Sequence, residues 1–353
     1  MALTRRGKAF VTGGTVAGLL VVGIGAMTLT GNAPAVVRDL AKAAGISDPA
    51  PTCPLTGTEL AQGKEVPDRP VLAVKVENTP DAQPLNGLDK ADIVYEEVVE
   101  GGITRFIAVF QCESTNRVGP VRSARTTDPK ILLQFSEHPL LAFSGGANKV
   151  VNTARDAGLT LMTEGDPAPP FTRDEARVVP HNLFANTAML WAAGQKRAKD
   201  EPIPRAVFAY ADEVPTPNKK GLGVTVVFSG LATADWRWEG GRYVRYSDGQ
   251  PMNLEDGNPI TADNVVIQQV KTTESGIIDA AGYPSPEVTV TGKGKAWVLR
   301  NGRLIQGTWD RAPDGDLTTF TTKAGETMTL TPGRTFVELA PTGMFDADIT
   351  FGK

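Results

Sequence analysis

The sequence predicts an α+β protein in which an α/β-type mixed domain is followed by a mostly β domain. Between residues 53 and 204, short apolar runs alternate with segments of helical pattern, the order typical of a mixed domain. From 223 to 341 the chain changes to short strands separated by turn signals. A Pro-rich passage, DEVPTPNKKG, marks a link between the two at 205–222. With 353 residues, 41% of them hydrophobic, the chain is long enough for two cores.

The N-terminal segment has the pattern of a membrane anchor. A basic flank, residues 1–8, precedes an uncharged run at 9–30, AFVTGGTVAGLLVVGIGAMTLT. A helix of about 22 residues rises roughly 33 Å, enough to cross a hydrocarbon core of about 30 Å. The flank places the N-terminus in the cytoplasm, which predicts a single-pass protein of the cell membrane with an extracytoplasmic globular part. The alternative is a signal peptide cleaved near Ala35, which would release a secreted protein. A linker at 31–52 follows.

The first domain is predicted from apolar runs and helical periodicity. Strands are expected at 71–76, 93–99, 104–111 and 140–143, and helices at 129–135, 148–157 and 187–196. The first helix is expected to begin with Pro129 at its N1 position and Asp128 as its N-cap.

The second domain is predicted from short strands between turns. Strands are expected at 224–228, 243–246, 264–271, 296–299, 303–309 and 336–339, and residues 342–353 are expected to be a tail. Asn301-Gly302 is a strong signal for a two-residue hairpin turn. The aromatic residues around Trp236 and Tyr243 are interpreted as core rather than as a platform for stacking sugars.

Composition excludes several classes of function. The net charge is −4 and no basic stripe interleaved with aromatic residues occurs, so no nucleic-acid partner is predicted. Two cysteines and two histidines cannot build a closed structural zinc site, and neither a metal nor a cofactor is predicted. Cys53 and Cys112 lie beyond the anchor, in a compartment where disulfides persist, so a bridge between them is one prediction. Two separately buried thiols are the alternative.

The segment EGGITRF is predicted to be a hairpin that turns at its two glycines. That turn pairs Val98 with Arg105, so that Arg105 lies between Glu96 and Glu100 on one face. Glu97 then falls on the opposite, largely apolar face, where a buried carboxylate needs a partner because an isolated one is costly.

Directly after the hairpin, VGPVRSART sets Arg122 and Arg125 around Ser123. Two guanidinium groups about 7 Å apart repel by roughly 2 kcal/mol at an effective dielectric near 20, so an anion is expected beside them. The anion is either a glutamate of the hairpin or a ligand that carries phosphate or carboxylate, which arginine binds bidentately. The nearby SGGA at 144–147 ends a strand and opens a helix, a place that attracts anions.

Several motifs together resemble the YerB-like family of bacterial extracytoplasmic proteins. They span both domains, from about Cys53 to Pro341: CPLTG, RPVLAVKVEN, LDKADIVYEEVVEGGITRF, VGPVRSAR, FTRDEARVVPHNLF, ITADNVVIQ and GKGKAWVLRNGRLIQGTW. The resemblance implies a two-domain extracytoplasmic protein but brings no established activity with it. Members are often lipoproteins, whereas this chain has no cysteine just after its apolar run, so a protein anchor is expected instead.

The resemblance also marks Arg177 and the pair His181-Asn182 as motif positions within FTRDEARVVPHNLF. Polar groups on a loop with rigid proline flanks are typical of binding sites. His181 is one of two histidines, so any histidine-dependent acid–base chemistry is expected to use it. The alternative is a structural histidine that bonds a backbone carbonyl.

From these features we expect an envelope protein that binds an anionic ligand through its first domain, and that is not an enzyme. The expected ligand is an envelope polymer or a small anion, and the membrane is contacted through the N-terminal helix. The candidate ligand-binding residues are Glu100, Arg105, Arg122, Ser123, Arg125, Arg177, His181 and Asn182. One alternative is a cell-wall hydrolase or transferase using Glu97 or Glu100 with His181, and another is a scaffold without a ligand. The sequence assigns no oligomeric state.

Overall fold

The computed structural model describes residues 50–352 apart from 167–168, 198–201, 217, 280–281 and 314–316. The predicted basic flank, the apolar run at 9–30 and nearly all of the linker lie outside the described residues. Within the described residues, no helix is both long enough and apolar enough to cross a bilayer. Thr52–Thr58 and the chain from Val66 onward form one compact unit.

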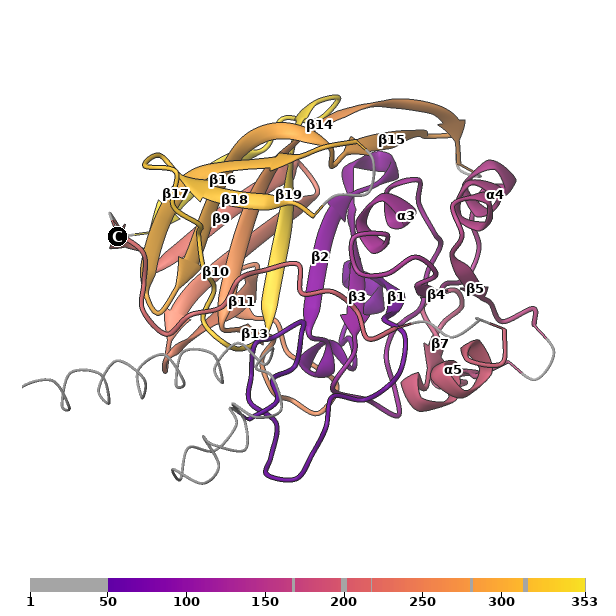
Figure 1. The fold of residues 1–353 in the computed structure, drawn as a ribbon. Coiled ribbons are helices and arrows are strands. Elements are labelled where there is room, and N and C mark those ends of the chain that lie inside the picture. The colour runs from indigo at the N-terminus through magenta and orange to yellow at the C-terminus, as the bar shows by residue number, and fades with distance from the viewer. Residues whose placement is uncertain are drawn as a thin grey trace, which may run out of the picture. The chain divides into compact units, whose positions relative to one another are not determined.

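A mixed sheet of twelve strands dominates this unit (Figure 1). Ten strands follow the order β18-β17-β16-β14-β19-β2-β3-β1-β4-β5, while β15 pairs with β14 and β8 with β17. The strands are β1 (Leu72–Glu77), β2 (Ile93–Val98), β3 (Thr104–Phe110), β4 (Leu140–Ala142), β5 (Thr160–Met162), β8 (Lys219–Lys220), β14 (Asn264–Ile278), β15 (Pro284–Thr289), β16 (Gly292–Arg300), β17 (Arg303–Arg311), β18 (Thr319–Thr322) and β19 (Thr335–Gly343).

The two halves of the chain meet inside this sheet. β19, from the C-terminal part, runs parallel to both β14 and β2, and places Glu338 beside Glu96 across the β19–β2 pair. The segments at 53–204 and 223–341 therefore contribute neighbouring strands to one continuous sheet.

A second sheet of six strands follows the order β12-β11-β10-β9-β20, with β13 paired to β11. Its strands are β9 (Gly223–Ser229), β10 (Ala232–Glu239), β11 (Arg242–Ser247), β12 (Gln250–Pro251), β13 (Thr261–Ala262) and β20 (Asp348–Gly352). β20 lies in the segment that we expected to be a tail, and it pairs along β9. A separate two-stranded sheet joins β6 (Phe171–Arg173) to β7 (Leu183–Ala185).

Among the described residues, helices are few and short, so this part of the fold is mostly β and the first domain is less helical than the sequence pattern predicts. They are α3 (Thr127–Leu132), α4 (Asn148–Asp156), α5 (Thr187–Gly194) and the single 3-10 turns η1 (Pro80–Ala82), η2 (Leu88–Lys90) and η3 (Glu100–Gly102). α4 and α5 begin where predicted. α3 begins two residues early, because Asp128 lies inside its first turn, where its carboxylate accepts from the backbone N–H of Arg125 at 2.7 Å.

The large sheet has a hydrophobic core on each face, as the alternation of side chains along a strand requires. On one face Val74 and Phe106 pack with Trp236 of the six-stranded sheet. On the other face Ala73 and Ile107 pack with Ile131 and the other apolar residues of α3 and α4. The aromatic residues Trp236 and Tyr243 are fully buried, which confirms their interpretation as core.

The register of the β2–β3 hairpin differs by one residue from the prediction. Val98 pairs with Thr104, and Glu97, not Val98, pairs with Arg105. The turn is longer than two glycines because Val99 accepts from Gly102 and donates to Ile103 across it. A shift of one residue moves every side chain to the opposite face, so Arg105 shares a face with Glu97 and not with Glu96.

Two local predictions are confirmed. Asn301 and Gly302, both at positive φ, form a two-residue turn between the paired residues Arg300 and Arg303. Cys53 and Cys112 form a disulfide with an S–S distance of 2.05 Å, which fixes the start of the described chain to the end of β3.

Candidate functional site

The segment VGPVRSART continues the sheet where β4 ends. β4 pairs with β1 only along Leu72–Val74, and beyond that point the backbone N–H of Arg122 donates to the carbonyl of Lys75 at 2.9 Å. On the outer side of this segment, Ser144 donates to the carbonyl of Arg122 at 2.9 Å. The segment is therefore held between β1 and the loop before α4.

The motif FTRDEARVVPHNLF joins the same region through β7. Val118 exchanges backbone hydrogen bonds with Ala185, and Val121 donates to the carbonyl of Leu183 at 2.6 Å. The loop between β6 and β7 carries His181, so this pairing brings the histidine to the end of β1. Two motifs about 60 residues apart in sequence thus meet at one place.

Three arginines and two glutamates form what we call the arginine cluster: Arg105, Arg122, Arg125, Glu77 and Glu100. Arg125 Nη2 donates to Glu100 Oε2 in a short hydrogen bond, and Arg105 Nη1 lies 3.8 Å from the same oxygen. Arg105 and Arg125 therefore share Glu100, which the sequence analysis had placed near both of them. The other two glutamates that we weighed as partners, Glu96 and Glu97, pair elsewhere.

Glu77 is the member of the cluster that the sequence analysis missed. Its carboxylate lies 3.3 Å from Arg122 Nε, 2.9 Å from His181 Nδ1, and accepts from Thr79 Oγ1 at 3.1 Å. It is the last residue of β1 and lies directly across from Arg105 in the β1–β3 register. A glutamate ending a strand that is apolar apart from Lys75 was the available signal, because a buried carboxylate requires partners.

The cluster carries more positive than negative charge. Three guanidinium groups face two carboxylates, and burial, followed by the like charge of Arg125, lowers the pKa of Arg105 to about 10. Among the described residues, no acceptor meets hydrogen-bond geometry with Nε or Nη1 of Arg105. Buried donors without acceptors are rare in folded proteins, so these two nitrogens are a departure that calls for an explanation.

Glu100 remains ionised inside this cluster. Burial acts to raise its pKa, but the Arg125 charge and the Ser285 hydroxyl together hold the pKa below its usual value. A carboxyl that stays ionised is a poor proton donor at neutral pH, which disfavours Glu100 as the acid of a hydrolase.

The solvent side of the cluster is formed by Arg122, Ser123 and His181. The side chains of Arg122 and His181 are 23% and 20% exposed. Beside them, the backbone N–H of Ala124 donates to the carbonyl of Gly145. Gly145 has a positive φ, and a Cβ atom added to it would lie 3.1 Å from Ser123 Oγ. The glycine therefore lets the loop before α4 approach Ser123 closely.

A second charged group, fully buried, supports the cluster from the core side. Lys75 Nζ donates to Glu97 at 2.6 Å and to Asp128 at 2.8 Å, and none of the three side chains is more than 1% exposed. Asp128 also accepts from the backbone of Arg125. Lys75 is thus the partner that Glu97 needed, and this burial argues against Glu97 as an acid or base that meets a substrate.

Arg177 and Asn182 are engaged outside the cluster. The Arg177 guanidinium donates to the carbonyls of Ala82 and Pro84 and lies 5.3 Å from the Phe184 ring centroid. Asn182 is buried and accepts from Arg173 at 2.8 Å. Their contacts hold the β6–β7 loop in place, so they position His181 rather than face a ligand with it.

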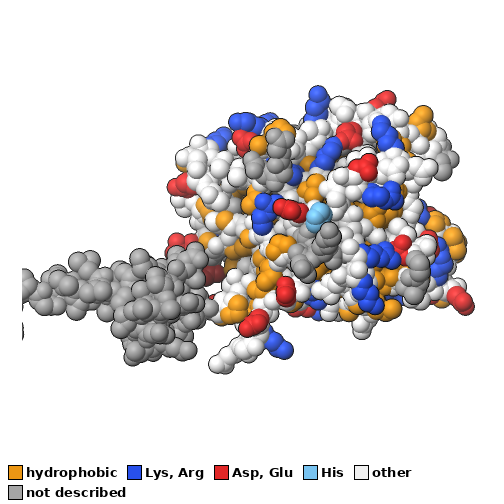
Figure 2. All heavy atoms as spheres, turned by 45° about the vertical axis from the view of Figure 1, so that its right-hand side comes forward, with side chains coloured by type: hydrophobic (Ala, Val, Ile, Leu, Met, Phe, Trp, Pro, Cys, Tyr) orange, Lys and Arg blue, Asp and Glu red, His pale blue; other side chains and the backbone are white. Residues whose placement is uncertain are grey.

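Basic and acidic side chains are mixed on one face of the molecule (Figure 2). On the face drawn in Figure 2, Lys and Arg side chains are interspersed with Asp, Glu and hydrophobic ones. Within the described part of the chain, no group of three or more His, Cys, Asp or Glu is arranged to hold a metal ion.

Comparison with known proteins gives a consistent family assignment. Residues 55–200 match the N-terminal domain, and 224–337 the C-terminal domain, of the family described as a protein of unknown function (DUF3048). The chain is 30% identical over 300 residues to YerB of Bacillus subtilis (strain 168), a candidate lipoprotein, covering 82% of this chain and 86% of that protein. The crystal structure of B. subtilis YerB matches with a TM-score of 0.69 at 27% identity, covering 85% of this chain and 99% of that one. These matches confirm the resemblance seen in the motifs: the chain belongs to the DUF3048, or YerB-like, family.

Proposed function

We propose that this protein works in the bacterial cell envelope, outside the cytoplasm, where it binds an anionic ligand at the arginine cluster. Two observations support this location. The relative from Bacillus subtilis is a candidate lipoprotein, and Cys53 and Cys112 form a disulfide, a bond that persists in oxidising compartments. Because no cysteine follows the apolar run directly, attachment through the run at 9–30 is the route that we propose.

The observation that carries the ligand is the unbalanced charge of the cluster. Arg105 is buried, and two of its nitrogens, Nε and Nη1, have no acceptor among the described residues, while Arg122 reaches solvent next to His181. A phosphate or carboxylate bound against Arg122 and Ser123 would add the missing negative charge and accept charge-assisted hydrogen bonds. Glu77 holds His181 by Nδ1, and Nε2, which has no hydrogen bond to the described residues, is the ring nitrogen that we expect to meet the ligand.

The test is a titration of the purified protein with inorganic phosphate and with acetate at low ionic strength, followed by calorimetry. Arg122→Ala removes the exposed guanidinium, and Arg155→Ala, on the exposed face of α4, is the matched control. One charge-assisted hydrogen bond contributes about 1.5–3 kcal/mol, so we expect Arg122→Ala to weaken binding about 10- to 100-fold. The control should bind as the unmodified protein does.

Two outcomes would contradict the proposal. If neither anion binds, or if Arg122→Ala binds as tightly as the control, the cluster is not the site. If Arg122→Ala lowers the melting temperature strongly while binding is kept, the arginine serves the fold, as the scaffold alternative holds.

A further inference from the structure

A cavity of about 400 Å³ lies on the other face of the large sheet from the arginine cluster. Thr104 lines it, while the next residue along β3, Arg105, belongs to the cluster, because neighbouring residues of a strand point to opposite faces. The volume falls within the range of small-molecule sites, about 300–1,000 Å³.

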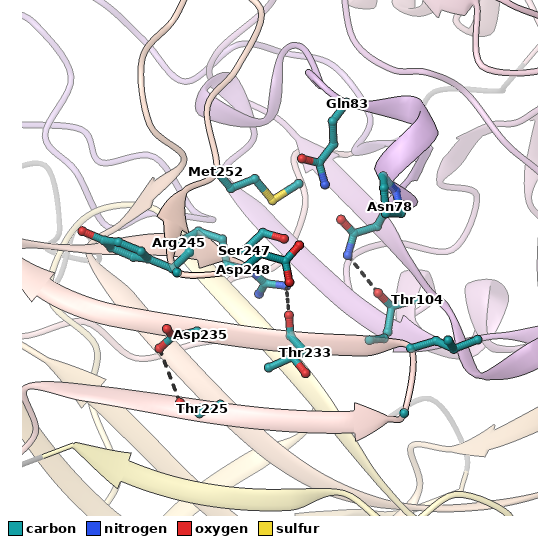
Figure 3. A pocket seen from close by; sticks show the side chains of 16 residues that line it. Asn78, Gln83, Thr104, Thr225, Thr233, Asp235, Arg245, Ser247, Asp248 and Met252 are labelled. Carbon is teal, nitrogen blue, oxygen red and sulfur yellow. Dashed lines mark hydrogen bonds between the residues drawn. The ribbon is translucent and has the colours of Figure 1, made fainter.

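Both halves of the chain build the cavity (Figure 3). Asn78, Pro80, Gln83 and Thr104 come from the first half, and the strands and turns of the six-stranded sheet supply the rest. The labelled residues from that sheet, its β11–β12 turn and the residue after β12 are Thr225, Thr233, Asp235, Arg245, Ser247, Asp248 and Met252. A pocket at the junction of two sequence segments is a common position for a ligand site.

The floor of the cavity is rigidly organised around Arg245. Its guanidinium lies 2.8 Å from Glu96 and 3.0 Å from Glu338, and it is 2% exposed. Glu96 in turn accepts from Thr104 at 2.7 Å and from Asn78 at 3.0 Å. The floor side chains are therefore fixed before any ligand arrives, which lowers the entropy lost on binding.

The charge of the cavity disfavours an anion. Of the described residues that line it, Arg245 is the single basic one, and the buried carboxyls of Glu96 and Glu338 already pair with it. Asp235 and Asp248 add acidic groups to the lining. An anionic ligand would meet acidic groups at the rim and find no free cation at the floor, in contrast to the arginine cluster.

The remaining lining is rich in hydroxyl and amide groups. Thr225, Thr233 and Ser247 offer hydroxyls, Gln83 offers an amide, and Met252 gives an apolar wall. Such groups can both donate and accept hydrogen bonds, which matches a ligand bearing many uncharged hydroxyls. We infer that the cavity binds an uncharged saccharide of one or two rings. This inference does not depend on the anion site, because the two sites lie on opposite faces and differ in charge.

The experiment titrates the purified protein with two uncharged probes, N,N′-diacetylchitobiose and maltose, and follows binding by calorimetry and by ligand-observed NMR. Thr233→Trp places an indole in the cavity from an exposed position, and Thr308→Trp, exposed on β17, is its control. We expect saturable binding of at least one probe, a loss of at least tenfold in Thr233→Trp, and no change in Thr308→Trp.

A second variant keeps the backbone of the β11–β12 turn. Asp248 is exposed and has a φ of 50°, a left-handed conformation that asparagine tolerates, so Asp248→Asn replaces the carboxylate acceptor without straining the turn and should weaken the same probe several-fold. Arg122→Ala should leave saccharide binding unchanged even where it weakens phosphate binding, so failure of one site is separable from failure of the other. The inference is overturned if neither saccharide binds at millimolar concentration, or if Thr233→Trp and Asp248→Asn both bind as well as Thr308→Trp.

Discussion

Replacing Lys75 by methionine should expose the cost of an unpaired buried charge most directly. The ammonium group lies 2.6 Å from Glu97 and 2.8 Å from Asp128, with all three side chains buried. At an effective dielectric near 20, each contact is an attraction of about 6 kcal/mol before the cost of desolvation. Methionine keeps most of the volume but leaves two carboxylates facing each other without a counter-charge.

We expect Lys75→Met to lower the free energy of unfolding by about 3–5 kcal/mol at pH 7, the usual cost of removing one partner from a buried ion pair. Burial already raises the pKa of Asp128 against the opposing effect of Lys75, and without the lysine that pKa rises further. When the pKa of a carboxyl group is higher in the folded state than in the unfolded state, its contribution to stability is fully present below the unfolded-state pKa. That contribution is lost as the pH rises through the folded-state pKa. The deficit of the variant should therefore shrink towards pH 4 and grow towards pH 8.

The assay is urea unfolding followed by tryptophan fluorescence at several pH values. Lys149→Met, on the exposed start of α4, is the control and should change stability by less than about 0.5 kcal/mol. Adding Glu97→Gln and Asp128→Asn to Lys75→Met should recover much of the loss, since the buried charges are then gone. A loss below about 1 kcal/mol at pH 7, or a deficit independent of pH, would refute the reasoning.

Three further predictions concern groups away from the cluster. Cys112→Ser opens a bridge to Cys53 that closes a loop of about 60 residues, and should cost about 4 kcal/mol in urea unfolding; an unchanged midpoint would contradict this. Burial raises the pKa of Asp92 to about 7, so the stability of the unmodified protein relative to Asp92→Asn should be greatest below pH 4 and fall by about 4 kcal/mol as pH rises to 8. A difference that stays constant with pH would exclude that shift. Burial, with the Glu96 charge, holds the pKa of Glu338 well above its usual value. The free energy of unfolding of Glu338→Gln should therefore lie within about 1 kcal/mol of that of the unmodified protein at pH 7, whereas Glu96→Gln should lower that free energy clearly more.

Local patterns in the sequence determined the elements and much of the cluster. The central strands, the starts of α4 and α5 and the Asn301-Gly302 turn follow from periodicity and turn chemistry, which act over a few residues. The grouping of Arg105 and Arg125 with Glu100 also followed, because the three lie close along the chain. The family resemblance added the position of His181.

Tertiary structure decided which partner each charge has. Lys75 and Glu77 lie on a strand whose pairing with β3 is a contact between segments about 30 residues apart, so no local pattern names them as partners of Glu97 and Arg122. The register of the β2–β3 hairpin determined which face of the sheet each glutamate of β2 occupies, because side chains alternate between faces with a period of two.

Long-range strand pairing also decided the architecture and the cavity. The parallel contact of β19 with β2 joins residues more than 200 positions apart and places Glu338 beside Glu96 under Arg245. Sequence by itself determined the central strands, the starts of α4 and α5 and the Asn301-Gly302 turn, since those choices are local, but it missed β10, β15, β18 and β20. It did not fix which strands meet, because that choice depends on the sum of contacts across the whole core.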